Sequence, residues 1–187
     1  MRFDPKLFKE KKACVIGLGR SGLAAARLLS RKGFKVFASD VRPRKDVRKS
    51  LGRLAASLQW EAGGHSDRIL KCDFAVKSPG LPPSAEVFQR LKQKGIPVFS
   101  EMEIALAFCK TSDVVAITGT NGKTTTTALV EQLFKAQRGR AVHLCGNIGV
   151  PLSEIVDKIR PKDVVIMEIS SYQLEDSRYF HPTAAAL

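Results

Sequence analysis

The loop that follows an apolar run near the middle of the chain carries residue types that could bind a nucleotide phosphate. It reads Thr118-Gly119-Thr120-Asn121-Gly122-Lys123-Thr124-Thr125, and a helical pattern follows at once. Gly119 and Gly122 allow a sharp turn with no Cβ between the backbone N–H groups and an anion. Lys123 can neutralise β- and γ-phosphate charge, and the Thr124 hydroxyl can bind Mg²⁺. We therefore predict a phosphate-binding loop, although the general pattern would place a Gly at Ile117; a plain glycine turn before a helix is the alternative.

Two polar residues farther along the chain could serve the same phosphate site. A buried-type apolar run ends in Glu168, and a carboxylate at the end of a strand beside the phosphate loop can hold Mg²⁺ directly or through water. The alternative is that Glu168 only flanks a capping box formed by Ser170 and Gln173; we favour the metal role. Asn147 lies in a second glycine turn, which suits either a polar contact to an anion or an ordinary strand-to-helix turn.

A fingerprint of dinucleotide-binding proteins stands near the N-terminus. The apolar run Ala13–Ile16 leads into Gly17-Leu18-Gly19-Arg20-Ser21-Gly22, and the next expected strand ends at Asp40, about twenty residues after the glycines as a ribose-binding acid requires. Gly17 and Arg20 are then expected near a diphosphate, and Asp40 and Arg42 near a ribose or base. The alternative is that Gly22 only permits close helix–strand packing and that Asp40 only caps a turn.

These motifs need parallel strands to present them, and the hydrophobic pattern supplies such strands. Apolar runs alternate with helical patterns, which indicates a doubly wound parallel α/β sheet. Before the phosphate loop we expect strands at 13–16, 35–40, 58–61, 73–77 and 96–99. The last should lie near an edge because of Pro97. The turn Ser78-Pro79-Gly80 falls at the carboxyl end of a strand, where open α/β sheets bind ligands.

The helical patterns complete a two-domain interpretation. We expect one helix over Val47–Leu58 and another that begins at Ser100, where Glu103 would complete a capping box. The helix after the phosphate loop is expected to turn four apolar residues inward: Leu129, Val130, Leu133 and Phe134. The fold class is α/β, with a Rossmann-like parallel-sheet domain at 1–104 and a P-loop-type α/β domain at 105–187.

The composition excludes several other classes of protein. The 187 residues are 44% apolar and 26% charged, which is ordinary for one or two globular domains. No apolar run approaches membrane-spanning length and no signal-peptide core is present. The four Cys and three His are scattered, which argues against disulfides and zinc and for a cytoplasmic protein. We assign the net charge of +13 first to solvated loops and helix faces, and it would also suit anionic substrates. Nucleic-acid binding is not expected, because no aromatic residues interleave the basic runs.

Taken together, the motifs resemble those of the Mur ligases and the related folylpolyglutamate synthases. The phosphate loop is similar to theirs. The run Glu168-Ile169-Ser170-Ser171-Tyr172-Gln173-Leu174-Glu175 is similar to the E-x-S-S-[FY]-Q-L-E motif of the members that add D-glutamate. The Gly17–Gly22 loop, Ser78-Pro79-Gly80 and Gly146-Asn147-Ile148-Gly149 fit the same ligases in order and spacing. The resemblance covers essentially the whole chain.

The resemblance implies that the first domain holds the UDP of a sugar substrate rather than NAD, and that the second binds ATP and Mg²⁺. The implied substrate-binding residues are Gly19, Arg20, Ser21, Asp40, Val41, Arg42, Ser78, Pro79, Gly80, Asn147, Ser170 and Gln173. The implied ATP-binding residues are Gly119, Thr120, Asn121, Gly122, Lys123, Thr124 and Thr125. Lys123 and Glu168 would be catalytic, and Thr124 and Glu168 would bind the metal. Asn147 would contact the diphosphate, while Ser170 and Gln173 would face the muramoyl-alanine end.

The resemblance also implies a reaction, namely ATP-driven amide formation in peptidoglycan precursor synthesis. The carboxylate of UDP-N-acetylmuramoyl-L-alanine would take the γ-phosphate to give an acyl phosphate, and the amine of D-glutamate would then displace phosphate. The family pattern continues beyond Leu187 with a metal-binding Asn/Asp-His motif, a carbamylated lysine and a domain that receives the amino acid. We therefore expect a monomeric fragment that lacks the D-glutamate site, comprises the first and part of the central domain, and does not turn over alone. We also expect the sheet edge near Leu187 to be weakly ordered or covered by a partner.

Three alternative functions stay open. An NAD-dependent oxidoreductase would explain Gly17–Asp40 but would leave the phosphate loop without a role; NAD binding that Asp40→Asn abolishes would favour it. A non-enzymatic nucleotide- or nucleic-acid-binding module would account for the positive charge, and a steep salt dependence of DNA binding would favour it. A sister ligase for another amino acid or for folate is the nearest enzyme, and the Ser170–Glu175 motif argues against it.

Overall fold

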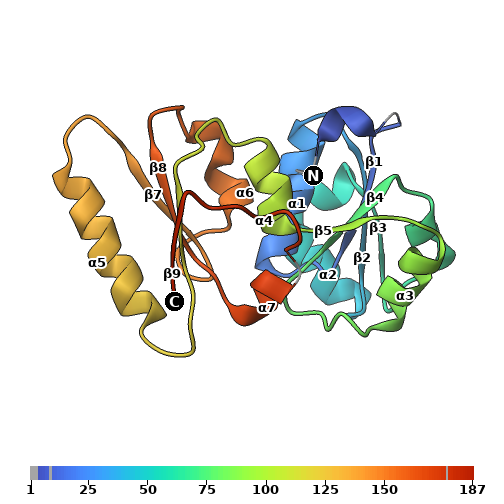
Figure 1. Ribbon diagram of the computed structural model, residues 1–187. Helices are drawn as coiled ribbons and strands as arrows, with labels where there is room; N and C mark the ends of the chain where they lie inside the picture. The colour runs from blue at the N-terminus through green and yellow to red at the C-terminus, as the bar shows by residue number, and fades with distance from the viewer. Residues whose placement is uncertain (1–3, 9, 176) are drawn as a thin grey trace.

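The computed structural model describes residues 4–8, 10–175 and 177–187, and its strands form two parallel sheets (Figure 1). The first sheet has the order β3-β2-β1-β4-β5 and contains β1 (Lys12–Ile16), β2 (Lys35–Asp40), β3 (Gln59–Ala62), β4 (Phe74–Lys77) and β5 (Val98–Ser100). The second has the order β7-β8-β6-β9 and contains β6 (Val114–Ile117), β7 (Val142–Gly146), β8 (Val164–Glu168) and β9 (Ala184–Ala186). All pairings between these strands are parallel, so the predicted α/β class is confirmed.

The helices connect the strands in the expected alternation, with one correction. They are α1 (Arg20–Arg31), α2 (Arg44–Leu51), α3 (Glu86–Gln93), α4 (Glu101–Ala107), α5 (Lys123–Ala136), α6 (Leu152–Ile155) and α7 (Ser171–Glu175). Short 3₁₀ turns add η1 (Pro5–Leu7), η2 (Gly52–Ala56), η3 (Asp67–Leu70) and η4 (Val156–Lys158). The single helix expected over Val47–Leu58 is wrong: α2 ends at Leu51, because Gly52 takes a φ of 55° and turns the chain into η2.

The end of the first sheet follows the sequence closely. β5 is an edge strand, as Pro97 predicted. Pro97 has no N–H to donate, but its carbonyl accepts a hydrogen bond from the N–H of Ala75 at 2.9 Å, so the chain pairs with β4 before β5 begins. The predicted capping box at the start of α4 is confirmed, with both the Ser100 and the Glu103 side chains hydrogen-bonded to the backbone.

Three helices lie between the two sheets, namely α1, α4 and α6 (Figure 1). One continuous apolar core runs through this layer. It joins Val15 and Val76 of the first sheet to Val165 and Met167 of the second, with Leu152 of α6 among the residues between them. The two sheets are therefore packed against a shared layer instead of being linked only by a loop.

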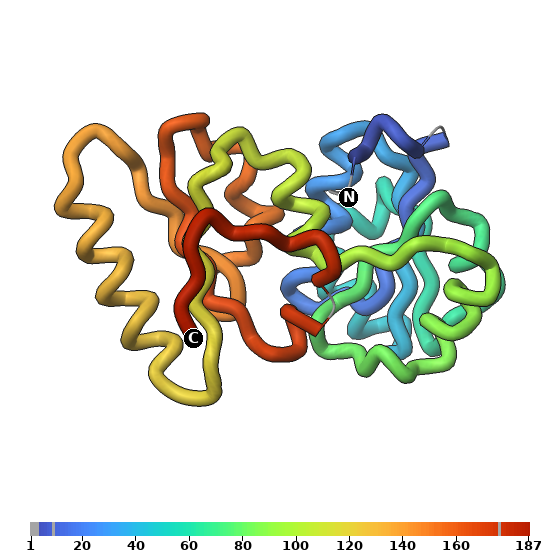
Figure 2. Tube along the Cα trace, viewed as in Figure 1, coloured from blue at the N-terminus to red at the C-terminus, as the bar shows by residue number. Residues whose placement is uncertain are grey.

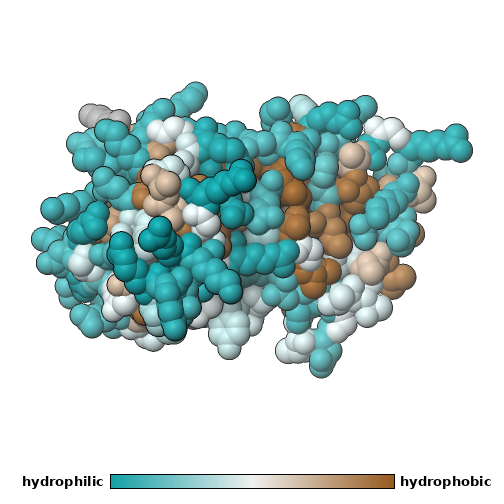
Figure 3. All heavy atoms as spheres, turned by 180° about the vertical axis from the view of Figure 1, so that it is seen from behind, coloured by the Kyte–Doolittle hydropathy of each residue, from teal (hydrophilic) through white to brown (hydrophobic). Residues whose placement is uncertain are grey.

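The outer helix of the second sheet, α5, differs from expectation. Val130 and Phe134 pack against the sheet, but Leu129 and Leu133 point outward and are 62% and 70% exposed. The prediction that all four face inward is wrong, because the two pairs lie on adjacent helical stripes about 100° apart and only one stripe meets the sheet. Seen from behind, apolar side chains gather on the half of the molecule that carries the second sheet (Figure 3).

The last stretch of chain returns from the first sheet to the second. After α7 the trace passes α4 and then runs beside β6 (Figure 2), where β9 pairs in parallel with Val115–Ile117. All three residues of β9 are exposed at the edge of the sheet. That this edge is weakly ordered or covered by a partner stays a prediction.

Candidate functional site

The phosphate loop is a turn between β6 and α5 that only glycine allows in two places. Gly119 has a φ of 134°, and Gly122, with a φ of 75°, is the N-cap residue of α5. No side chain caps this end of the helix, so its first N–H groups are free to meet an anion. The Lys123 ammonium folds over the loop and donates to the carbonyl oxygens of Gly119 at 2.5 Å and Thr120 at 3.2 Å.

The structure brings three of the predicted site residues into direct contact. The Glu168 carboxylate, 1% exposed, accepts hydrogen bonds from the Thr124 hydroxyl and from the Asn147 side-chain amide, each at 2.8 Å. Sheet register explains the meeting, because Ile117 and Gly146 both pair with Glu168. The carboxyl ends of β6, β7 and β8 thus deliver a hydroxyl, an amide and a carboxylate to one point.

The turn that carries Asn147 is built for close approach. Gly146 has a φ of 103°, and a Cβ there would lie 2.3 Å from the Glu168 carbonyl oxygen. That same carbonyl accepts the Asn147 N–H at 2.7 Å. Any side chain at position 146 would therefore push β7 away from β8 and separate Asn147 from the buried carboxylate.

The glycines of the first sheet also have separate structural tasks. Gly17 has a φ of 82°, and a Cβ on it would lie 2.9 Å from the Cβ of Ser78, which places the Ser78-Pro79-Gly80 turn directly beside this loop. A Cβ on Gly22 would lie 1.9 Å from the Gly17 carbonyl oxygen, so close packing of the loop on α1 requires a glycine. The carboxyl ends of β1 and β4 therefore form one surface.

Asp40, the expected ribose-binding acid, is engaged within the protein. Its carboxylate accepts the Leu18 N–H at 2.6 Å, the Arg42 N–H at 2.8 Å and the Arg42 guanidinium at 3.0 and 2.9 Å. Burial pushes the pKa of Asp40 upward, but these donors outweigh burial and hold the pKa below its usual value. Arg42 also donates to the Leu18 carbonyl at 2.8 Å, so the pair fixes the glycine loop. Beside them, Val41 is 57% exposed.

One residue links the two glycine-rich regions. The guanidinium of Arg20, at the start of α1, donates to the carbonyl of Gly149 in the turn after β7. The first-sheet loop that contains Gly19 and Ser21 is thereby held against the turn that contains Asn147. Two of the predicted substrate-binding residues, Arg20 and Asn147, therefore lie on segments that touch each other.

Ser170 and Gln173 form the capping box that the sequence offered as an alternative. The Gln173 side-chain oxygen accepts the Ser170 N–H at 3.0 Å, and the Ser170 hydroxyl accepts the Gln173 N–H at 3.3 Å. Gln173 is 5% exposed. The box sets α7 immediately after Glu168. The capping role of Ser170 and Gln173 and their expected substrate-binding role therefore fall on the same residues.

Sequence analysis missed a buried acid between the sheets. Glu101, 2% exposed, accepts the Ser153 N–H at the start of α6 at 2.8 Å. Burial raises the pKa of Glu101, and the hydrogen bonds from Ser153 oppose that rise only in part. No sequence signal could have found it, because acids in the first turn of a helix are ordinarily solvated.

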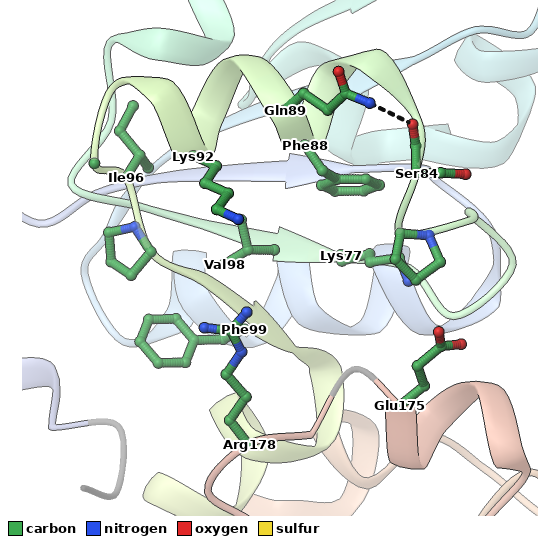
Figure 4. Close-up of a pocket in the computed structure, with 13 residues that line it drawn as sticks. Lys77, Ser84, Phe88, Gln89, Lys92, Ile96, Val98, Phe99, Glu175 and Arg178 are labelled. Carbon is green, nitrogen blue, oxygen red and sulfur yellow. Dashed lines mark hydrogen bonds between the residues drawn. The ribbon is translucent and has the colours of Figure 1, made fainter.

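A groove of about 570 Å³ runs along β5 and α3 (Figure 4). Phe88 and Val98 form its floor, while Glu175 and Arg178 approach from the other sheet's side. None of the predicted site residues lines it. The groove therefore adjoins the Ser78 turn through Lys77, but it is not the nucleotide-binding site that the motifs predict.

The part of the chain that the structure describes contains neither a metal-ligand cluster nor a membrane-spanning helix. Across residues 4–8, 10–175 and 177–187, no three His, Cys, Asp or Glu side chains come together as a metal cluster. Over the same residues, no helix has both the length and the apolar character needed to cross a bilayer.

Comparison with known families matches both halves of the chain. Residues 12–87 match the MurD N-terminal domain, and residues 117–187 match the Mur ligase middle domain. The chain is 47% identical to the UDP-N-acetylmuramoylalanine–D-glutamate ligase of Elusimicrobium minutum (strain Pei191), over 99% of this chain and 41% of that protein. It is 44% identical to the ligase of the same name from Chlorobium phaeobacteroides (strain BS1), over 95% of this chain and 38% of that protein.

A solved structure supports the fold alone. A murein peptide ligase from Psychrobacter arcticus 273-4 superposes with a TM-score of 0.57 at 21% identity, over 93% of this chain and 42% of that one. The chain spans about two fifths of the length of the curated relatives it matches, 41% and 38% for the two named above.

Proposed function

Because the chain belongs to the Mur ligase family, we propose that it forms the UDP-substrate domain and the ATP-binding part of a ligase that joins D-glutamate to UDP-N-acetylmuramoyl-L-alanine in peptidoglycan precursor synthesis. The observation that carries the proposal is the contact of Thr124 and Asn147 with the buried Glu168. We assign the first domain to 1–104 and the second to 105–187, with the boundary inside α4. We further infer a cytoplasmic monomer.

The residues around the phosphate loop fit Mg-ATP. A hydroxyl and a carboxylate oxygen, from Thr124 and Glu168, are the hard ligands that Mg²⁺ takes alongside phosphate oxygens and water. One or two such ligands suffice, which agrees with the lack of a larger acidic cluster among the described residues. When bound, Mg²⁺ would offset phosphate charge. Lys123, now folded on the loop carbonyls, would turn to the β- and γ-phosphates, and the N–H groups at the start of α5 would also face them.

The first sheet fits a UDP-sugar better than NAD. In NAD-binding Rossmann folds the acid at the end of the second strand accepts the ribose hydroxyl. Here both carboxylate oxygens of Asp40 already accept hydrogen bonds from Leu18 and Arg42. The glycine loop, the Ser78 turn and the Asp40–Arg42 segment would then line the UDP site. Arg20, whose guanidinium donates to the Gly149 carbonyl, would then contact the diphosphate.

The chemistry that this arrangement serves is attack of one anion on another. A substrate carboxylate oxygen bonds to the γ-phosphorus as the bond to the bridging oxygen of ADP breaks, which leaves an acyl phosphate. An amine nitrogen then bonds to the acyl carbon, phosphate leaves and the amine loses a proton. Lys123 and the N–H groups of the loop would lower the cost of bringing the two anions together. Glu168 would hold the Thr124 hydroxyl and Asn147 in place.

Calorimetric titration of the 187-residue chain with UDP-N-acetylmuramoyl-L-alanine, Mg-ATP and NAD tests the proposal. We expect the first two to bind and NAD not to. Lys123→Ala should abolish Mg-ATP binding and leave the UDP-sugar unaffected, which assigns each ligand to its own sheet. Binding of NAD instead of the UDP-sugar would mean that the first sheet is a dinucleotide domain and that the proposal is wrong.

A further inference from the structure

The sheets are connected by a hydrogen-bond network that starts at a buried acid on α4. Glu103, 5% exposed, closes the capping box of α4 with one carboxylate oxygen, which accepts the Ser100 N–H at 2.9 Å and the Ser100 hydroxyl at 3.0 Å. Its other oxygen accepts the N–H groups of Arg178 at 2.8 Å and Tyr179 at 2.7 Å. A single side chain thus holds its own helix and a segment 75 residues farther along the chain.

A serine hydroxyl continues the network into α7. Ser177 lies 3.2 Å, oxygen to oxygen, from the Ser100 hydroxyl and donates to the Gln173 carbonyl at 2.7 Å. Gln173 in turn caps Ser170. The chain of contacts therefore runs from Glu103 and Ser100 to the capping box that follows Glu168.

α7 needs this support. It has five residues, and a helix of that length does not hold itself in water. Its first turn is held by the Ser170 box, and the chain that follows it is held where Ser177 reaches Ser100 and where the N–H groups of Arg178 and Tyr179 reach Glu103. Figure 4 shows the side chains of Glu175, on α7, and Arg178 at the edge of the groove along β5.

We propose that Glu103 is a positioning residue that fixes Gln173 and Ser170 relative to the first sheet, and so sets the affinity for the part of the substrate beyond the UDP. This inference rests on the proposed function, in which UDP is held by the first sheet and the muramoyl-alanine portion reaches α7. Glu103 touches neither ligand. It acts through the two N–H groups that it accepts and through Ser177.

The test compares two ligands on the same protein. Glu103→Gln keeps the size of the side chain but replaces one carboxylate oxygen by an NH₂ group. That group then faces donors, either those of Ser100 or the N–H groups of Arg178 and Tyr179. By calorimetry, we expect the affinity for UDP-N-acetylmuramoyl-L-alanine to fall about tenfold, the loss of roughly one charge-assisted hydrogen bond, while affinities for UDP and for Mg-ATP stay unchanged. Amide hydrogen exchange at Arg178 and Tyr179 should become faster. Glu86→Gln, on the exposed start of α3, makes the same chemical change without these contacts and should have no effect.

Ser177→Ala provides a second variant if Glu103→Gln does not fold. It leaves the α4 box intact and should reduce the preference for the UDP-sugar over UDP in the same direction. Equal loss of UDP and UDP-sugar affinity, or no change in either variant, would refute the positioning role. Failure of the unsubstituted chain to bind the UDP-sugar would instead refute the proposed function, while the exchange measurement would still report whether Glu103 anchors the segment.

Discussion

Replacement of Asp40 by Asn should destabilise the fold by about 3 kcal/mol, and the structure supplies the reasoning. An Asn oxygen can still accept the Arg42 N–H and Nε, but its NH₂ group then faces the Leu18 N–H and the Arg42 Nη2, which are both donors. A lost hydrogen bond to a buried charged acceptor costs about 1.5–3 kcal/mol. The ion pair adds at most about 1 kcal/mol, because the Arg42 side chain is 40% exposed.

Urea unfolding at pH 7 measures this difference, with Asp46→Asn as the control. Asp46 is exposed on α2 and near Arg42, so its substitution should cost less than about 0.5 kcal/mol. The pH dependence adds a second check. Since the folded-state pKa of Asp40 is lowered, its stabilisation is present above the unfolded pKa of about 3.9 and disappears as the pH falls through the lower folded value.

The difference in the free energy of unfolding between the wild-type chain and Asp40→Asn should therefore be constant from about pH 7 to 5 and shrink below about pH 4. A loss under about 1 kcal/mol at pH 7, or a gap that persists in acid, would show that Asp40 does not hold the loop through its charge. NAD binding by the unsubstituted chain would also contradict this reasoning, because it would show that Asp40 is available to a ribose hydroxyl.

Three further outcomes follow from the geometry. Lys123→Met should weaken Mg-ATP binding by more than about tenfold without altering thermal stability, because the ammonium contacts only loop carbonyls; an unchanged affinity in calorimetry would contradict this role. Gly22→Ala should cost at least about 3 kcal/mol by urea unfolding, since its Cβ would lie 1.9 Å from the Gly17 carbonyl oxygen; a folded variant of normal stability would show that the loop can move. Leu129→Lys and Leu133→Lys should each change stability by less than about 0.5 kcal/mol, given exposures of 62% and 70%; a large loss in thermal unfolding would contradict the outward orientation of these two side chains.

Local patterns predicted strands such as β1, β4 and β8 well because they are buried apolar runs bounded by turn residues. β2 occupies Lys35–Asp40 as expected, and both capping boxes could be recognised from residues three apart. The prediction that all four apolar residues of α5 face inward was wrong for a physical reason. Four apolar residues in two adjacent stripes are compatible with either stripe facing the sheet, and the sequence does not say which neighbour is present.

The site itself shows why residue types could be named while their contacts could not. Strand-end positions predicted that Thr124 and Glu168 could share Mg²⁺ and that Asn147 could face an anion. They did not predict that the three side chains touch, since sheet order β7-β8-β6 is a property of the assembled chain. The same holds for Asp40, whose position fitted a ribose contact until its partners were known. Motifs locate polar side chains at strand ends. The hydrogen bonds that a side chain already makes within the protein decide which of its donors and acceptors remain for a ligand.

Glu103 illustrates the same point in the opposite direction. As a capping residue it needed one of its two carboxylate oxygens, and sequence reasoning stopped there. The second oxygen was available, and the fold used it to hold Arg178 and Tyr179. An acid buried to 5% exposure with all of its partners on the backbone or on a serine is not needed for helix initiation alone, because an exposed cap performs that task at lower desolvation cost. The proposed function would explain this burial, because it requires the two sheets to be kept in register around one substrate.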